Sequence, residues 1–300
     1  MFEKILVPLD GSEISEQALP CAQEIVGRLG SKIVLMQVSE TGESGLYHVQ
    51  ELYINQIAQK VKEIVKKFRE QPVEVEPAIL IGSAADEIIK YADKNDVGLV
   101  VMGTHGRSGI SRWAVGSVAN KVIRGTKAPV MLVRSRESCP VAKSRLLTRV
   151  VVPLDGSEVG EAALPYVIDM ATKLDMEVIL FQAVSLAYHV YASGEIVSQV
   201  PYTNQEMQPV VASVRAYLDK VADRLKAKNL RVRTDAKTGS AADSIIKAAD
   251  EFQADLVAMS THGRSGISRW VFGSVAERVL QAGTTPLLLV RAPGAVVDAG

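Results

Sequence analysis

The stretch Val-Pro-Leu-Asp-Gly-Ser-Glu occupies residues 7–13 and returns unchanged at residues 152–158. Two further stretches repeat in the same way: THGRSGISRW at 104–113 returns at 261–270, and GSVA at 116–119 returns at 273–276. The first repeat lies 145 positions further along the chain, and the other two lie 157 positions further. The chain is therefore one unit written twice, and its second copy holds twelve additional residues.

The additional residues fall between the aligned pair Gln37 and Gln182 and the repeated GSAAD at 82–86 and 239–243. This position predicts an insertion in the loop that follows the second strand of copy two. Residues 192–209 mix Gly, Ser, Pro and polar side chains, which are typical of loops. We expect this loop to lengthen the cover over a ligand site in copy two.

Length and composition agree with two globular domains. The chain has 300 residues, 47% of them hydrophobic, which is enough for a core in each copy and excludes a disordered protein. Its 34 basic residues balance 34 acidic ones, so the composition excludes a basic nucleic-acid-binding module. The start carries no apolar leader and no apolar run is long enough for a membrane span, so we expect a cytoplasmic protein that contacts no membrane. The predicted domains are 1–138 and 147–293, joined by a linker at 139–146.

The pattern within each copy predicts an α/β fold. Short β-branched runs at 4–9, 32–38, 73–80, 97–102 and 129–133 are typical of strands. Apolar residues at helical spacing lie between them, from Ile57 to Phe68 in copy one and from Val210 to Leu225 in copy two. Continuously apolar strands that alternate with helices favour two tandem doubly wound domains, each a five-stranded parallel sheet with helices on both faces. Ligands of such folds bind beyond the carboxyl ends of the strands.

A glycine-rich loop follows the fourth predicted strand of copy one. It runs from Gly103 through Gly106 and Arg107 to Gly116 and Ser117, where a helix is predicted to begin. Glycines let backbone N–H groups face an anion, and a helix start offers further unpaired N–H groups and positive potential. This arrangement predicts a phosphate site in which Arg107 adds charge and Ser117 contacts an oxygen. The alternative is an ordinary glycine-rich turn whose serine only caps the helix.

The spacing Gly103-x2-Gly106-x9-Gly116-Ser117 resembles the ATP-binding signature of the universal stress protein family. The VPLDGSE, GSAAD and APVMLV stretches are also similar to that family, so the whole chain resembles a tandem-domain member. The resemblance implies strand order 3-2-1-4-5 and ATP, ADP or AMP held where the order reverses, with Mg²⁺ accompanying the phosphates. It assigns Asp10 to the adenosine. The remaining contacts implied for copy one are backbone near Pro8 and Val38 at the adenine, and Gly103, Gly106, Arg107, Gly116, Ser117 and the Val118 amide at the phosphates.

Copy two departs from the signature at its first glycine, where Ser260 stands. Binding there is in doubt if that backbone needs a positive φ, although a serine hydroxyl can itself contact a nucleotide. The alternative role for Asp155, as for Asp10, is a helix N-cap, for which Ser12 and Ser157 compete. The positions implied for the second site are Pro153, Asp155, Ala183, Ser260, Gly263, Arg264, Gly273, Ser274 and Val275.

The sequence holds no Walker lysine loop, no GxGxxG after the first strand and no GxSxG elbow. We therefore assign no catalytic residue and expect a nucleotide-dependent sensor or regulator in the stress response, with at most slow ATP hydrolysis. The alternatives are an adenine-nucleotide-hydrolysing or phosphate-transferring enzyme and a scaffold that binds no nucleotide. The terminal strands are expected sheet edges, and an apolar edge invites pairing. The resemblance implies that this edge joins two domains, so the copies are predicted to pair as an intramolecular pseudo-dimer, and two chains to form a homo-oligomer.

Overall fold

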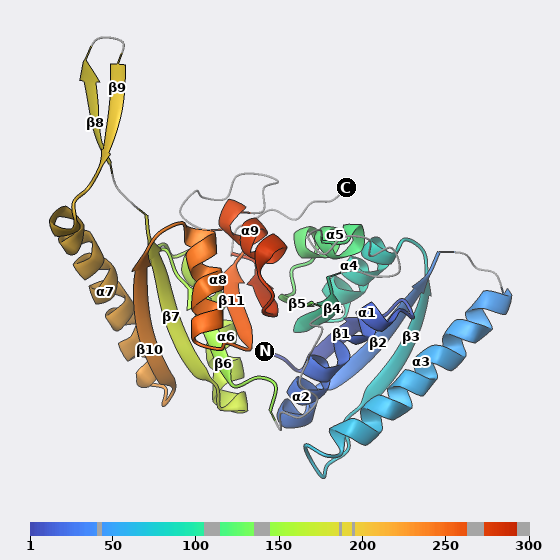
Figure 1. Ribbon diagram of the computed structural model, residues 1–300. Coiled ribbons are helices and arrows are strands. Elements are labelled where there is room, and N and C mark those ends of the chain that lie inside the picture. The colour runs from blue at the N-terminus through green and yellow to red at the C-terminus, as the bar shows by residue number, and fades with distance from the viewer. Residues whose placement is uncertain are drawn as a thin grey trace.

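The computed structural model describes residues 1–40, 44–104, 115–134, 145–185, 188–193, 196–262 and 273–292 (Figure 1). Copy one alternates strands and helices, and each predicted strand is present with its ends within two residues of expectation. The last predicted helical residue, Phe68, lies beyond α3, because the amides of Lys67 and Phe68 bond three residues back and end the helix in a tight turn. The elements are β1 (Lys4–Pro8), α1 (Glu13–Glu16), α2 (Leu19–Leu29), β2 (Lys32–Ser39), α3 (Ser44–Val65), β3 (Val75–Ile81), α4 (Ala84–Lys94), β4 (Leu99–Gly103), α5 (Ser117–Gly125) and β5 (Val130–Val133).

Copy two repeats this order with one addition, a pair of short strands after its second strand. Its helix α7 contains the whole predicted apolar stretch from Val210 to Leu225. The elements are β6 (Arg149–Pro153), the 3₁₀ helix η1 (Gly160–Ala163), α6 (Leu164–Leu174), β7 (Glu177–Val184), β8 (Tyr188–Ser193), β9 (Ile196–Pro201), α7 (Asn204–Lys226), β10 (Arg231–Thr238), α8 (Ala241–Glu251), β11 (Leu256–Ser260), α9 (Ser274–Ala282) and β12 (Leu287–Val290).

Ten strands form one continuous sheet in the order β10-β7-β6-β11-β12-β5-β4-β1-β2-β3. Each half has the expected parallel order 3-2-1-4-5, which reverses between β1 and β4 in copy one and between β6 and β11 in copy two. The halves meet where β12 pairs with β5 antiparallel, with Leu288 opposite Met131. The doubly wound fold is confirmed, and the terminal strands join the copies at the expected edge.

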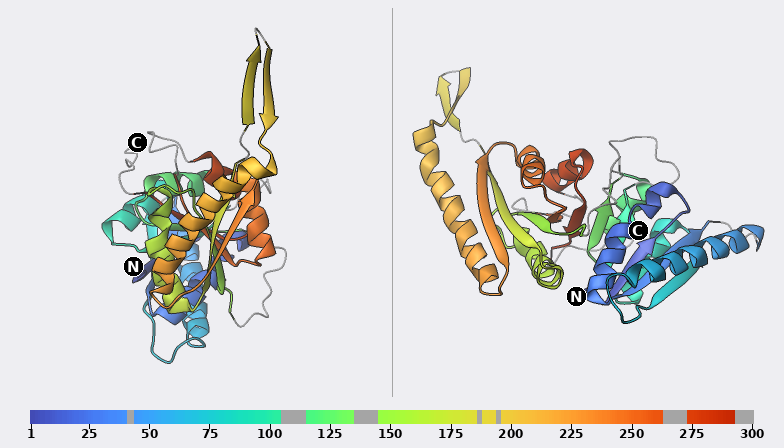
Figure 2. Two further views of the ribbon diagram at one scale, coloured as in Figure 1. Left: turned by 90° about the vertical axis from the view of Figure 1, so that its left-hand side faces the viewer. Right: turned by 60° about the horizontal axis from the view of Figure 1, so that its bottom comes forward.

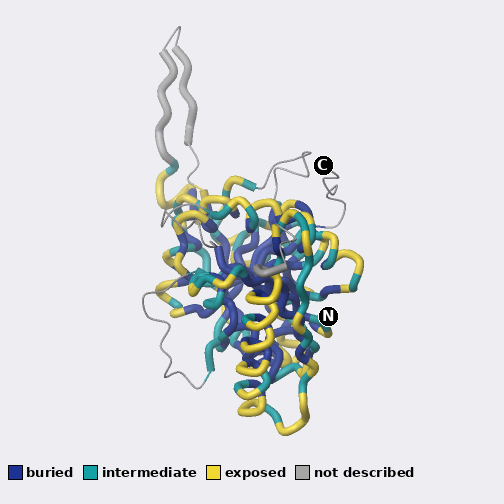
Figure 3. The backbone as a smooth tube through the Cα atoms, turned by 90° about the vertical axis from the view of Figure 1, so that its right-hand side faces the viewer, coloured by how far each residue is buried: buried dark blue, intermediate teal, exposed yellow. Residues whose placement is uncertain are grey.

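Helices cover both faces of this sheet, and the core lies in two layers (Figures 1 and 2). One layer packs α2, α3, α6 and α7 against the sheet, and the other packs α4, α5, α8 and α9. Both layers contain residues of both copies, so neither stops at the junction. Figure 3 shows the buried strands inside and exposed outer turns on the helices. The site sought at the strand ends therefore rests on a rigid support.

The twelve-residue insertion is not the predicted loop. It contributes to an antiparallel hairpin of β8 and β9, which extends beyond the start of α7 (Figure 1). The loop prediction failed because Tyr, Val and Ile alternate with polar residues in this segment, a strand pattern that the Gly and Ser content concealed. Pro209, also assigned to the loop, is the sixth residue of α7, where its ring removes the N–H that would donate to the carbonyl of Gln205.

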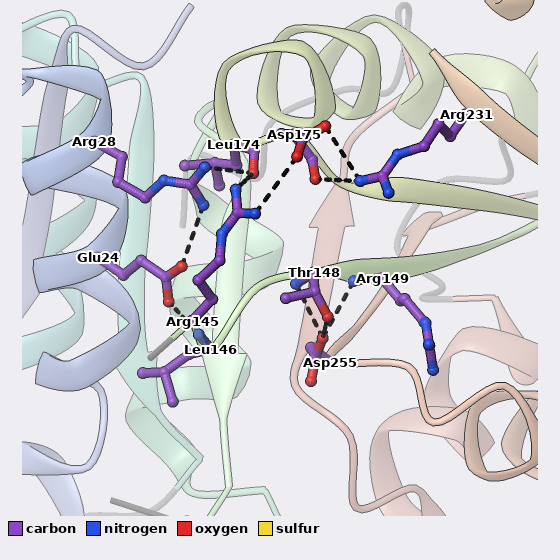
Figure 4. Close-up of polar contacts among 10 residues, drawn as sticks. All are labelled: Glu24, Arg28, Arg145, Leu146, Thr148, Arg149, Leu174, Asp175, Arg231 and Asp255. Atoms are coloured by element: carbon purple, nitrogen blue, oxygen red, sulfur yellow. Dashed lines mark hydrogen bonds and ion pairs between the residues drawn. The ribbon is translucent and has the colours of Figure 1, made fainter. Parts of the chain in front are cut away.

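The end of the linker is held by both copies (Figure 4). The backbone N–H of Leu146 donates to the buried Glu24 carboxylate of α2 at 2.6 Å, and Arg28 donates across the copies to the carbonyl of Leu174 at 2.6 Å. Arg145 reaches the same carbonyl at 2.8 Å. The predicted linker residues 139–144 lie outside the described residues, and 145–146 are fixed parts of the junction.

Candidate functional site

The DGSE stretch forms the same turn after the first strand of each copy, and side-chain hydrogen bonds hold it in place. One Asp10 oxygen accepts from the backbone N–H of Ser12 at 3.0 Å and from its hydroxyl at 2.6 Å. Asp155 holds Ser157 at the same two distances. The glycine between them has a φ of 82° in copy one and 84° in copy two, which a side chain would disfavour. Both carboxylates are thus oriented at the strand ends.

The aspartates do not occupy the N-cap of the helix that follows, which is Ser12 for α1 and Val159 for η1. Ser12 is the N-cap of α1 and accepts from the amide of Ser15 at 3.2 Å. Ser157 accepts from the amide of Gly160, the first residue of η1, at 3.0 Å. The alternative in which Asp10 and Asp155 serve as helix N-caps is therefore wrong. Each aspartate is half-buried beside its own strand end.

A glycine occupies the N-cap of the helix after each glycine-rich loop. Gly116 precedes α5 and Gly273 precedes α9, and neither helix has a side-chain cap hydrogen bond. Ser117 and Ser274 are the exposed first helical residues, so the alternative in which Ser117 only caps the helix is wrong. The first N–H groups of both helices are left for another acceptor.

The two ends of each glycine-rich loop are tied together. The amide of Gly116 donates to the carbonyl of Thr104 at 2.8 Å, and that of Gly273 donates to the carbonyl of Thr261 at 2.9 Å. A Cβ on Gly273 would lie 2.9 Å from the Thr261 carbonyl oxygen, closer than side chains normally approach. The chain therefore requires glycine at this close approach. The predicted contacts Gly106, Arg107, Gly263 and Arg264 lie outside the described residues.

A pocket in copy two brings together every predicted second-site residue that the structure describes. It lies beyond the carboxyl ends of β6, β7 and β11, where the strand order reverses, and is bounded by the starts of α8 and α9. The predicted lining residues are Pro153, Asp155, Ala183, Ser260, Gly273, Ser274 and Val275. The additional ones are Leu154, Gly160, Gln182, Ser185, Ala241, Ile245, Met259, Thr261, His262 and Ala276.

The copy-one residues lie at the matching places. Pro8 ends β1 with Asp10 two residues beyond it, and Val38 lies near the end of β2. Gly103 ends β4, while Gly116, Ser117 and Val118 form the start of α5. The repeat thus places equivalent groups at two strand-order reversals of one sheet.

Ser260 fits its position without backbone strain. It is the last residue of β11, as Gly103 is the last residue of β4, so extended backbone serves at both positions and no positive φ is needed. Ser260 is 5% exposed, and its hydroxyl oxygen accepts from the amide of His262 at 3.3 Å. The ring of His262 in turn meets the hydroxyl of Thr261 at 2.9 Å.

Two side chains of α7 hold Glu161, which follows the pocket residue Gly160 in the chain. The hydroxyl of Tyr217 donates to Glu161 at 2.9 Å, and Arg224 donates to the other oxygen of Glu161 at 2.6 Å. Burial, followed by the Glu161 hydrogen bond and the charges of Glu161 and Asp155, raises the pKa of Tyr217 well above its usual range. Tyr217 therefore remains a neutral donor. Copy one repeats the contact between Tyr53 and Glu16 at 2.9 Å.

Sequence reasoning missed these groups and Gln182. Gln182 lines the pocket, is 4% exposed, and has a buried side-chain oxygen with no hydrogen-bond partner among the described residues. Its aligned residue Gln37 is 3% exposed and has the same unpartnered oxygen. The available signal was a polar residue repeated within an otherwise apolar strand in both copies.

Within the described ranges, no helix is both long and apolar enough to cross a bilayer. In the same part of the chain, no three His, Cys, Asp or Glu side chains are grouped so as to hold a metal ion.

Comparison with known proteins gives a family match for both copies. The model of the universal stress protein family matches residues 1–134 and 147–291. The chain is 30% identical to universal stress protein MJ0531 of Methanocaldococcus jannaschii over 141 residues, which cover 45% of this chain and 83% of that protein. It is also 30% identical to universal stress protein YxiE of Bacillus subtilis over 148 residues, 45% of this chain and all of that protein.

Solved structures resemble the whole chain. A universal stress protein from Archaeoglobus fulgidus superposes with a TM-score of 0.68 at 19% identity, covering 97% of this chain and 99% of that one. A putative universal stress protein from Pseudomonas aeruginosa gives 0.65 at 17% identity, covering 97% and 94%. At these identities the likeness shows the fold alone.

Proposed function

The chain belongs to the universal stress protein family, and on that premise we propose that it binds an adenine nucleotide in each copy and acts as a nucleotide-dependent regulator in the stress response. The observation that carries the proposal is the pocket of copy two, where Asp155 and the uncapped start of α9 face one space. A nucleotide needs a donor set for its phosphates and a separate polar contact for its nucleoside. This pocket offers both.

The start of α9 suits the phosphates. Its first N–H groups have no side-chain acceptor, and the helix dipole places partial positive charge there. Gly273 removes the Cβ that would otherwise crowd the Thr261 carbonyl, and the exposed Ser274 offers a hydroxyl. Gly263 and Arg264 complete the proposed phosphate contacts. Mg²⁺ would accompany the phosphates.

The strand ends suit the nucleoside. The Asp155 turn holds a carboxylate at the end of β6, where a carboxylate can accept from ribose hydroxyls or from the adenine amino group. Pro153 and Ala183 place backbone beside it, and Leu154 supplies apolar surface for a base. Copy one offers Pro8, Asp10 and Val38 in the same arrangement. ATP, ADP and AMP share the groups that these residues would contact.

A regulatory role fits this lining better than a catalytic one. Phosphoryl transfer by dedicated enzymes uses a positioned base and a cation at the transferred group. The imidazole that lines the pocket, His262, already meets the Thr261 hydroxyl. We propose that nucleotide occupancy changes the conformation or partners of the protein, with hydrolysis at most slow, and that the protein works as a cytoplasmic homo-oligomer.

The test is to purify the protein without added nucleotide, denature it, and identify and count the released nucleotides per chain by chromatography with mass detection. Two adenine nucleotides per chain support both sites, and one supports a single site. Gly116→Val and Gly273→Val assign the occupied copy, because each should remove one nucleotide while leaving the circular dichroism spectrum intact. No released nucleotide, followed by no ATP uptake in calorimetric titration, would contradict the proposal and favour a scaffold.

A further inference from the structure

The buried glutamines at the ends of the second strands have a polar atom that the fold leaves without a partner. Within the part of the chain that the structure describes, the side-chain oxygen of Gln182 has less than 1 Å² of exposed area and no hydrogen-bond partner, and Gln37 shows the same in copy one. Such an oxygen is too enclosed for a water molecule to contact it. A buried acceptor without a donor destabilises a protein, and the chain carries this feature at two equivalent positions. The repetition points to a shared role.

Gln182 lies at the end of the pocket opposite the proposed phosphate site. Val178 and Leu180, which precede it at strand spacing, belong to the core layer that contains η1 and α7. By the same alternation, Gln182 faces that layer. The start of α9 belongs to the other layer. A nucleotide with its phosphates at α9 therefore extends its nucleoside toward Gln182.

The depth of Gln182 favours the base over the ribose. Gln182 is 4% exposed, whereas Asp155 and Ala183 beside it are only half-buried. A base is flat and largely apolar, so it enters the deepest part of a pocket, and a ribose with its hydroxyls stays nearer water. A carboxamide offers an acceptor and a donor side by side, which matches the amino group and adjacent ring nitrogen of adenine.

We infer that Gln182, and Gln37 in copy one, read the base, with the side-chain oxygen accepting from the 6-amino group of adenine. Binding then requires the carboxamide to turn toward the base, which supplies the donor that the ligand-free protein lacks. This inference rests on the proposed function, because it names what the same sites recognise. It adds a specificity-determining residue to each copy.

The test compares ATP with purine riboside triphosphate, which differs from ATP by lacking the 6-amino group. Affinities are measured by calorimetric titration for the unaltered protein and for the double variant Gln37→Leu, Gln182→Leu. We expect the double variant to bind ATP about tenfold more weakly and to lose much less affinity for the amino-free nucleotide, which has only the ring-nitrogen contact to lose. Each single variant should alter one of the two sites.

Control measurements separate a lost contact from a damaged fold. Gln208→Leu makes the same chemical change at an exposed position of α7 and should leave both affinities unchanged. The ligand-free double variant should unfold at the same or a higher temperature, because it loses two buried polar groups without partners.

The remaining outcomes overturn the inference in distinguishable ways. An equal loss of affinity for both nucleotides, or no loss for either, would show that the glutamines do not read the amino group, while the proposed function stands on ATP binding by the unaltered protein. If neither nucleotide binds to the unaltered protein, the proposed function and this inference fail together.

Discussion

At the residue scale, Ser260 and Gly103 occupy the same place in the two copies but offer different chemistry to the loop that follows. The Ser260 hydroxyl accepts from the amide of His262, which orders the start of the loop before a ligand arrives. A glycine cannot make this bond. Because both positions have extended backbone, serine costs no backbone strain. We therefore expect Ser260 to support the proposed second site rather than weaken it.

Exchanging these two residues tests that argument. We predict that Ser260→Gly weakens nucleotide binding to copy two by about fivefold, because one hydrogen bond of about 1 kcal/mol no longer pre-orders the loop. Gly103→Ser should strengthen binding to copy one by a similar factor. Calorimetric titration of each variant, in chains whose other site is disabled by a glycine-to-valine change, measures both effects. Tighter binding by Ser260→Gly would contradict the prediction.

At the element scale, strands were easier to predict than the chain between them. The strands β1, β2, β4 and β5 are almost fully buried, so a continuous apolar run marks them and their ends. The hairpin of β8 and β9 escaped prediction because its apolar residues alternate with Ser and Gln, as in many loops. The turn residues that flank the hairpin indicated a loop, although its apolar residues recur at strand spacing.

The candidate site was predictable to the same limited degree. Repeated glycines and the DGSE stretch identified most of its backbone. The positive φ of Gly11 and the close approach at Gly273 both require glycine, and a repeated glycine is visible in the sequence. The tyrosine contact and the buried Gln182 escaped because their partners come from distant elements. Only the fold places Tyr217 beside Glu161, at a separation of 56 residues.

One arginine after the terminal strand of each copy contacts a helix of the other copy. Arg134, just after β5, donates to the carbonyls of Leu280 and Gln281 in the last turn of α9. Arg291, just after β12, donates to the carbonyl of Arg124 in the last turn of α5 at 3.1 Å. Cations at helix C-termini complement the helix dipole and bond carbonyls that lack partners.

We predict that Arg134→Ala and Arg291→Ala each lower the free energy of unfolding by about 1 kcal/mol. The double variant should lose the sum of the two free energies, because the two contacts lie at separate helices. Urea unfolding monitored by circular dichroism measures these values. Lys228→Ala, which removes an exposed cation outside the junction, is the control and should change little. A double variant as stable as the unaltered protein would rule out a stabilising role for these arginines.

At the scale of the whole molecule, the junction between the copies buries the carboxylate of Glu24. Burial raises the pKa of Glu24, although the amide of Leu146 and the charge of Arg28 act in the opposite direction. A carboxyl group whose pKa is higher in the folded than in the unfolded chain stabilises the fold most when protonated. This contribution is present below its unfolded pKa of about 4.3 and is lost as the pH rises through the raised value.

Glu24→Gln removes this titration and retains an oxygen for the Leu146 amide. We predict that, as the pH rises from about 4 to about 7, the unaltered protein loses stability relative to Glu24→Gln. Urea unfolding of both proteins across that range gives the difference directly, and titrations common to both cancel. A difference that is constant, or that favours the unaltered protein more at higher pH, would contradict the assigned direction of the pKa shift.

We expect the continuous sheet to make the two copies one unfolding unit. Both core layers pass from one copy to the other, and the junction pair Met131 and Leu288 is fully buried. Unfolding one copy alone would expose the apolar edge of the other, so we predict a single calorimetric transition for the unaltered protein. Met131→Asp places a charge without a partner at this edge, at a cost of several kcal/mol.

Met131→Asp should therefore separate the unfolding of the copies into two transitions. Ile81→Asp makes a matched change at an exposed position of the outer strand β3, where the charge stays in water, and should retain a single transition. Differential scanning calorimetry distinguishes these cases. A single transition in Met131→Asp, at a temperature close to that of Ile81→Asp, would mean that the coupling does not depend on this buried pair. Two transitions in the unaltered protein would mean that strand pairing holds the copies together without coupling their stabilities. In that case nucleotide binding to one copy would stabilise that copy alone, whereas a coupled sheet transmits the stabilisation to both.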